Sequence, residues 1–146
     1  MTADPLTVSW QVLRAAAQLV EQIQRAVEDE GFDVRPVHGY AFVRISRGDA
    51  TVVDVAEHLG VTKQSASQLV DQLVQRGYVT REPHPHDARA RLLALTARGV
   101  ACTRAADRAA SEAMTQWRRE MGVRDFETVH RALAAVVLPG PVRPPW

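Results

Sequence analysis

The fold is decided by residues 51–77, TVVDVAEHLGVTKQSASQLVDQLVQRG, which predict two short amphipathic helices in immediate succession. Thr51 and Thr62 are typical N-caps, because a threonine hydroxyl can accept from an unpaired N–H of the first turn. After each cap, apolar residues recur at helical spacing until a glycine ends the run. These residues are Val52, Val55, Ala56 and Leu59, then Ala66, Leu69, Val70 and Leu73. A short joint that contains Gly60 predicts a helix-turn-helix.

The segments around this pair complete a mainly helical fold with one small β-hairpin. Tyr78–Glu82 and Arg91–Leu95 read as short strands, and the prolines between them predict a loop. We expect a long helix over about residues 7–30, a shorter one over about 36–45, and a long one over about 97–121 that Thr96 caps. A last helix is expected over about 124–138. Its expected inner face consists of Phe126, Val129, Leu133, Val136 and Val137.

The distribution of charge favours a nucleic-acid partner. The net charge of the 146-residue chain is only +1, but residues 60–98 carry six basic and three acidic side chains, whereas residues 1–35 carry three basic and six acidic ones. A basic middle segment is what a DNA-binding surface requires. Because the asymmetry is small, an ordinary scatter of solvated charge is the alternative.

The second helix of the pair has a polar face that suits the major groove of DNA. Glutamine can pair with adenine through two hydrogen bonds, and lysine and serine can reach bases or phosphates. The alternative is a solvated face on a purely structural helix. The predicted DNA-contacting residues of this helix are Thr62, Lys63, Gln64, Ser65, Ser67 and Gln68.

The hairpin that follows is predicted to be a wing with a second DNA contact. Arg89 near its tip can enter the narrow, negative minor groove, with Asp87 holding it in place. Arg81 and Arg91 can reach phosphates from the strands. The alternative for the tip is an exposed ion pair of little energetic weight.

Residues 51–99 resemble the winged helix-turn-helix of the MarR family, the multiple-antibiotic-resistance regulators. The most specific part is the wing signature Asp87-Ala-Arg89, followed by LTARG at residues 95–99. The family often has two adjacent arginines after the wing aspartate, and Ala88 stands at the first of these positions. The resemblance places residues 63–68 on the recognition helix, and it places Arg89 at the position that meets the minor groove.

The resemblance implies a homodimer in which the first and last helices of two subunits interleave. Two recognition helices related by two-fold symmetry predict a palindromic operator with half-sites about one DNA turn apart. The implied function is a sequence-specific transcriptional regulator, expected to be a repressor. The expected segments are an N-terminal dimerisation helix at 1–35, the DNA-binding region at 36–95, C-terminal dimerisation helices at 96–138 and a Pro-rich tail at 139–146.

Many relatives of this kind release DNA when a small, often aromatic and anionic, molecule binds between their dimerisation and DNA-binding parts. A ligand does this only if it binds more tightly at one spacing of the two DNA-binding regions than at another. Plain packing is the alternative role for the residues that would form such a pocket. The candidates are Trp10, Arg14, His38, Tyr40 and Phe42.

A redox switch, a metal and a cofactor are not expected. The hydroperoxide sensors of the resembled family use a reactive cysteine in the first helix, whereas Cys102 is the one cysteine of this chain and is expected to pack as a small apolar residue. His84 and His86 in the wing have no cysteine or glutamate beside them to complete a zinc shell.

Two other function classes have less support. No phosphate loop, nucleophile elbow or HExxH pattern indicates an enzyme. A winged helix that binds proteins should expose aromatic or aliphatic anchors on its second helix, and residues 63–68 supply none. The absence of a signal-peptide pattern and of a long apolar stretch predicts a cytoplasmic protein without a membrane partner.

Overall fold

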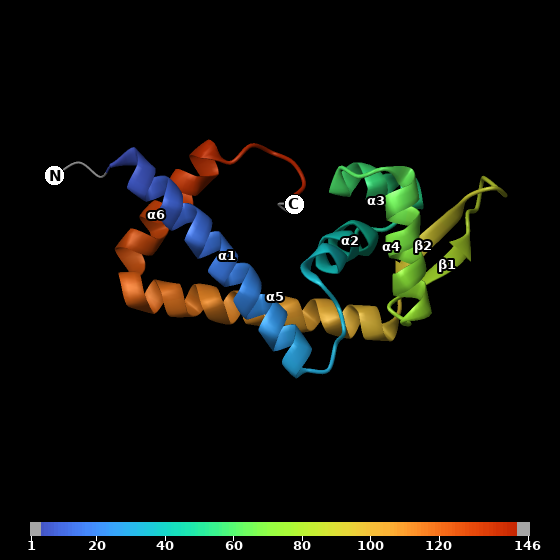
Figure 1. Cartoon of the computed structure of the whole chain (residues 1–146), viewed down its shortest axis with the longest axis horizontal. Helices are drawn as coiled ribbons and strands as arrows, with labels where there is room; N and C mark the ends of the chain where they lie inside the picture. The colour runs from blue at the N-terminus through green and yellow to red at the C-terminus, as the bar shows by residue number, and fades with distance from the viewer. Residues whose placement is uncertain (1–3, 143–146) are drawn as a thin grey trace. The chain divides into compact units, whose positions relative to one another are not determined.

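The computed structural model describes residues 4–142, and this part of the chain contains six helices and a two-stranded antiparallel sheet (Figure 1). Residues 143–146 of the expected Pro-rich tail lie outside the described residues. The predicted mainly helical winged helix-turn-helix is confirmed. The elements are α1 (Pro5–Asp29), α2 (Pro36–Ser46), α3 (Val52–Leu59), α4 (Lys63–Gln75), β1 (Val79–Pro83), β2 (Arg91–Leu95), α5 (Ala97–Met121) and α6 (Val123–Val136).

The chain forms two compact units. One runs from Asp33 to Arg104 and contains α2, α3, α4 and the hairpin, and we call it the winged-helix unit. The other combines the chain up to Phe32 with Ala105–Leu138, and we call it the helical unit. The helix α5 belongs to both, because its first turns pack with the winged helix and the rest runs on into the helical unit.

Three threonines start helices as the sequence predicts. The Thr51 hydroxyl accepts from the backbone N–H of Asp54, whose carboxylate accepts in turn from the backbone N–H of Thr51 at 2.7 Å. The Thr62 hydroxyl accepts from the N–H of Ser65 at 3.1 Å, and the Thr96 hydroxyl accepts from that of Gly99 at 3.1 Å. Each such cap contributes about 1 kcal/mol of helix stability.

The core of the winged-helix unit lies between α2, α3, α4 and the hairpin. The strands pair from Val79 opposite Leu95 to Pro83 opposite Arg91. The backbone N–H of Leu93 also donates to the carbonyl of Ala50 at 2.7 Å, which fixes the hairpin to the segment before α3. The largest side chains that are fully buried here are Phe42, Leu59, Leu73 and Tyr78.

A polar network joins four residues of this unit, from three segments that are distant in sequence. The Tyr78 hydroxyl donates to the Asp33 carboxylate at 2.6 Å and accepts from the N–H of Asp33 at 3.1 Å. The Arg98 guanidinium lies 3.2 Å from the same carboxylate and 4.5 Å from the centre of the Tyr78 ring. Arg76 donates to the Asp33 carbonyl at 2.8 Å. The hydrogen bond from Tyr78 and the two cations hold the pKa of Asp33 below its ordinary value despite the opposing effect of desolvation.

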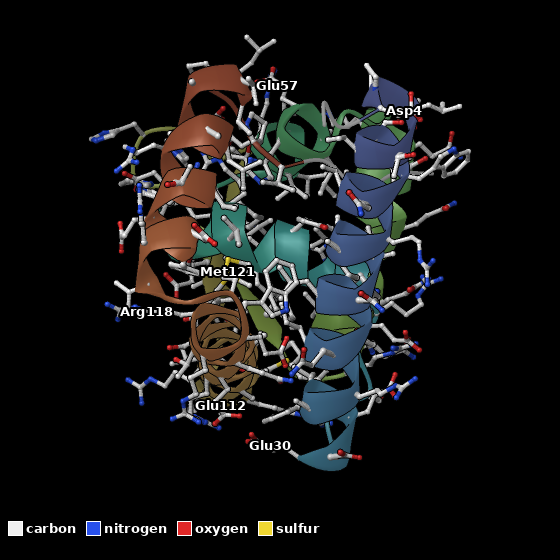
Figure 2. All side chains as sticks on the ribbon, turned by 90° about the vertical axis from the view of Figure 1, so that its left-hand side faces the viewer. Asp4, Glu30, Glu57, Glu112, Arg118 and Met121 are labelled. Atoms are coloured by element: carbon white, nitrogen blue, oxygen red, sulfur yellow. The ribbon has the colours of Figure 1, made fainter. Side chains whose placement is uncertain are left out.

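The helical unit contains α1, α6 and most of α5 (Figure 2). Ala105, Ala109 and Ala113 form one buried stripe on α5, and Arg108 donates to both oxygens of Glu30 at the end of α1. The expected inner face of α6 is not buried within one chain. Its residues Val129, Leu133 and Val136 are 40%, 44% and 72% exposed, because no other part of the described chain covers them. None of the helices in residues 4–142 is both long and apolar enough to cross a membrane.

Candidate nucleic-acid interface

The helix α4 is buried along one face and polar along the other. Ala66, Val70 and Leu73 are completely buried, Leu69 is half-buried, and the elements that pack against α4 are α3 and β1. This is the buried face predicted from the sequence. It fixes the rotation of the helix, so the opposite face is turned to solvent.

The structure brings the predicted residues of α4 onto one exposed surface, which we call the α4 polar face. Lys63, Gln64 and Gln68 are exposed, and Ser67 is half-buried at the edge of this surface. Thr62 and Ser65 are exposed too, but their hydroxyls are already bonded to each other at 2.9 Å as part of the helix cap. The side-chain donors and acceptors outside this cap therefore belong to Lys63, Gln64 and Gln68.

The wing presents exposed arginines, although Asp87 acts differently from the expectation. Its carboxylate accepts from the backbone N–H of Arg89 at 2.9 Å, and not from the guanidinium. Its carbonyl accepts from the N–H of Ala90 at 3.1 Å. Asp87 thus shapes the turn at the wing tip, and the Arg89 side chain is exposed there.

The two strand arginines of the wing have different surroundings. Arg81 is ion-paired with Asp71 of α4 at 2.5 Å, so it ties the wing to α4. Arg91 is exposed and pairs with no carboxylate among residues 4–142. The ion pair of Arg81 joins residues ten positions apart on two elements, and the sequence pattern did not indicate it.

One basic residue near α4 was not predicted from the sequence. Arg35 precedes α2, and it lines a depression of about 360 Å³ along the side of α4. The other residues of this depression are Val37, Leu59, Val61, Ser65, Gln68, Leu69 and Gln72. A signal was present in the sequence, since Arg35 stands directly before a proline that starts a helix, but its proximity to α4 depends on tertiary packing.

The five candidate effector residues lie in different environments. His38 and Phe42 are buried in the winged-helix unit, where Phe42 packs on Tyr78 with ring centres 5.8 Å apart, and Tyr40 is half-buried. Trp10 and Arg14 lie on α1 in the helical unit, and both are exposed. Burial holds the pKa of His38 at about 4, helped by the positive charges of Arg35 and Arg76, so the ring is neutral at pH 7.

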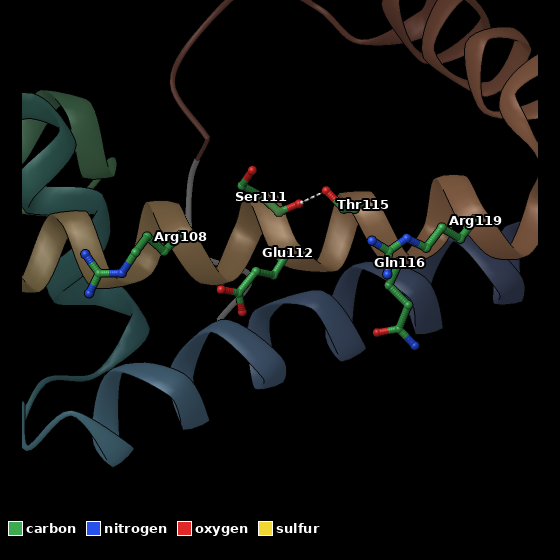
Figure 3. Close-up of a pocket in the computed structure, with 6 residues that line it drawn as sticks. All are labelled: Arg108, Ser111, Glu112, Thr115, Gln116 and Arg119. Carbon is green, nitrogen blue, oxygen red and sulfur yellow. Dashed lines mark hydrogen bonds between the residues drawn. The ribbon is translucent and has the colours of Figure 1, made fainter.

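A separate polar groove follows α5 in the helical unit (Figure 3). It is an open hollow of about 520 Å³, and the Thr115 hydroxyl at its centre donates to the carbonyl of Ser111 at 2.8 Å. Its arginine nearest the winged-helix unit in sequence, Arg108, is already paired with Glu30. No group of three or more metal-ligating side chains occurs among the described residues, and the two wing histidines form a local contact in which the His86 N–H donates to His84 Nδ1.

Comparison with known proteins shows a similar sequence segment and similar folds. Residues 32–90 match the family model of the MarR family. The fold is similar to that of RV1404 from Mycobacterium tuberculosis, with a TM-score of 0.80 and 23% identity over 92% of this chain and 93% of that one. It is similar to wild-type apo MarR from E. coli, with a TM-score of 0.72 and 18% identity over 94% and 100% of the two chains.

A third similar structure was solved with nucleic acid. It is a mutant of MepR from S. aureus bound to an oligodeoxyribonucleotide, with a TM-score of 0.67 and 17% identity over 88% of this chain and 94% of that one. No curated protein matches the sequence. At these identities the solved structures establish the fold, and the family model matches the winged-helix segment of the chain.

Proposed function

We propose that this chain, whose residues 32–90 match the MarR family model, is a regulator of that family and acts as a homodimeric repressor on a palindromic DNA site. The observation that carries the proposal is the α4 polar face, held outward by a buried opposite face and placed next to a wing with exposed arginines. The family consists of transcription regulators and not of enzymes.

Each part of the interface has a role in this proposal. Gln64 and Gln68 read base edges in the major groove, where a glutamine can discriminate adenine, and Lys63 binds phosphate or a base. Arg89 and Arg91 bind the minor groove and the adjacent backbone. The hydroxyls of Thr62 and Ser65 support this surface through the helix cap.

The exposed apolar residues of the helical unit support the dimer. On α1, Leu6, Trp10 and Leu13 are 64%, 60% and 60% exposed, and α6 exposes a second apolar face. Monomeric proteins rarely leave such contiguous surface open to water. We propose that residues 5–29 and 123–138 of one copy pack against the same residues of a second copy. We also propose that the protein acts in the cytoplasm.

A releasing ligand is the finer part of the proposal. Trp10 and Arg14 are one helical turn apart on α1, so an aromatic ring and a guanidinium lie on the same face of the helix. A small aromatic anion suits this pair, because the ring can stack and the carboxylate can bind the guanidinium. Such a ligand would act by favouring one spacing of the two DNA-binding regions.

Fluorescence anisotropy of the purified protein tests the function. The probes are a duplex from upstream of its own gene and a scrambled duplex of the same composition, each titrated over a series of salt concentrations. We expect a strong preference for the upstream duplex and a steep loss of affinity with salt. The double variant Gln64→Ala/Gln68→Ala should lose the preference, whereas Gln116→Ala on α5, outside the two segments proposed to form the dimer, should keep it. Equal weak binding of both duplexes by the parent protein would contradict this proposal for the tested site.

A further inference from the structure

We propose that Arg35 binds a DNA backbone phosphate on the side of α4 opposite the wing. This inference rests on the proposed function, because it extends the footprint of the same interface. It starts from the depression along α4, which Arg35 of the segment before α2 shares with Ser65, Gln68 and Gln72 of α4.

The two sides of α4 are identified by the contacts of two neighbouring residues. Consecutive residues of an α-helix are rotated by about 100°, so Asp71 and Gln72 lie on different sides of the outward face. Asp71 is ion-paired with Arg81 of β1, which marks the wing side. Gln72 lines the depression with Arg35, which marks the other side. The α4 polar face is therefore bracketed by the wing and by Arg35.

DNA supplies a phosphate backbone on both of these sides. The major groove is about 12 Å wide and is bordered by two sugar-phosphate strands. A helix that enters the groove brings both of its flanks near a backbone. The wing arginines can bind the backbone on one flank. On the other flank a cation is needed, and Arg35 is the only cation among the residues that line the depression.

The charge of Arg35 is available for this contact. Four other arginines of the winged-helix unit are engaged by protein oxygens within residues 4–142: Arg44 by Asp54, Arg81 by Asp71, and both Arg76 and Arg98 by Asp33. Arg35 is exposed and has no carboxylate within ion-pair distance in the described part of the chain. The nearest acid in sequence, Asp33, is already bound to Tyr78 and to those two arginines.

The backbone of Arg35 is held in place by the buried residue His38. The N–H of Arg35 donates to His38 Nδ1 at 3.0 Å, and the carbonyl of Arg35 accepts from the N–H of His38 at 2.9 Å. The following residue, Pro36, removes further backbone freedom. A guanidinium on an ordered backbone loses less conformational entropy on binding a phosphate than one on a mobile loop, and its planar fork matches two phosphate oxygens.

The test compares Arg35→Gln with Arg104→Gln, which removes the same charge from an exposed position on α5 that belongs to the same unit. Affinity for a duplex of random sequence is measured by anisotropy across a salt series. Each phosphate contact contributes about 0.9 to the slope of log affinity against log salt, so two per dimer should reduce the slope by about 1.8. The same slope predicts a loss of about thirtyfold at 0.15 M salt relative to a 1 M reference.

We expect Arg104→Gln to keep the parent slope and Arg35→Lys to keep most of it, because the lysine retains the charge. If the slope of Arg35→Gln equals that of Arg104→Gln, Arg35 binds no phosphate and the proposal is wrong. A loss of affinity at unchanged slope would also overturn it, since that pattern indicates a structural effect. Both results leave the proposed function intact, which fails only if the parent protein itself shows no specific DNA binding.

Discussion

Substitution of Gly99 by alanine should destabilise the winged-helix unit, because a β-carbon has no room there. A Cβ at Gly99 would lie 2.3 Å from the carbonyl oxygen of Tyr78 and 3.3 Å from the Leu95 side chain. The carbonyl cannot retreat freely, since it accepts from the N–H of Thr96 at 3.0 Å and belongs to a residue whose side chain is fully buried.

The magnitude follows from three contributions. Overpacking of this kind costs about 1–3 kcal/mol, and loss of the hydrogen bond to Thr96 adds about 1 kcal/mol. The higher helix propensity of alanine offsets up to about 1 kcal/mol of this loss. We therefore expect Gly99→Ala to lower the free energy of unfolding by about 1–3 kcal/mol.

Urea unfolding followed by circular dichroism measures this change, at one protein concentration because the stability of the proposed dimer would depend on concentration. Gly39→Ala is the matched control. Gly39 is inside α2, and nothing lies within 4 Å of the position that an alanine methyl group would take, so alanine there should raise stability by about 0.5–1 kcal/mol. A Gly99→Ala midpoint at or above that of the parent protein would show that the site accommodates the methyl group.

Other perturbations test the remaining interactions. Tyr78→Phe removes the hydroxyl that bonds twice to Asp33, so chemical unfolding should show a loss of about 1–3 kcal/mol, and an unchanged midpoint would contradict this. The pKa of His38 is about 4 in the folded protein and 6.5 ordinarily, so the unfolded state takes up the proton first as the pH falls. The contribution of neutral His38 to the free energy of unfolding should be fully present above pH 6.5 and should fall by up to about 3 kcal/mol toward pH 4. In His38→Gln the free energy of unfolding should decline less steeply over this range. Gln64→Ala should cost about 1–3 kcal/mol at one base position of a mapped site, whereas Arg89→Ala should weaken all duplexes similarly and reduce the salt slope; binding to single-base variants separates the two patterns.

Much of the fold was predictable because its signals are local. Thr51, Thr62 and Thr96 each cap a helix through a residue three positions away, and the bounds of β2 follow from a run of five residues. The buried face of α4 follows from helical spacing alone. Family resemblance added the expectation of a dimer, which spacing does not supply.

The contacts that escaped prediction are those between residues far apart in sequence. Asp33 and Tyr78 are 45 positions apart, and their hydrogen bonds depend on how α2 and β1 pack. The same applies to Arg35 beside α4. The apolar face of α6 was predicted as an inner face, but one chain leaves it exposed. A face that packs against a second copy, as proposed, has the same periodic pattern as one buried within a chain.

In vitro selection from a random-sequence duplex library with the 146-residue protein tests whether this winged helix reads DNA sequence. A dimer that presents two α4 helices should enrich an inverted repeat with half-sites about 10 base pairs apart, and Gln64→Ala should change the enriched bases within each half-site. Enrichment of no common sequence after repeated rounds, at low salt where binding is strongest, would contradict the claim that this winged helix reads DNA.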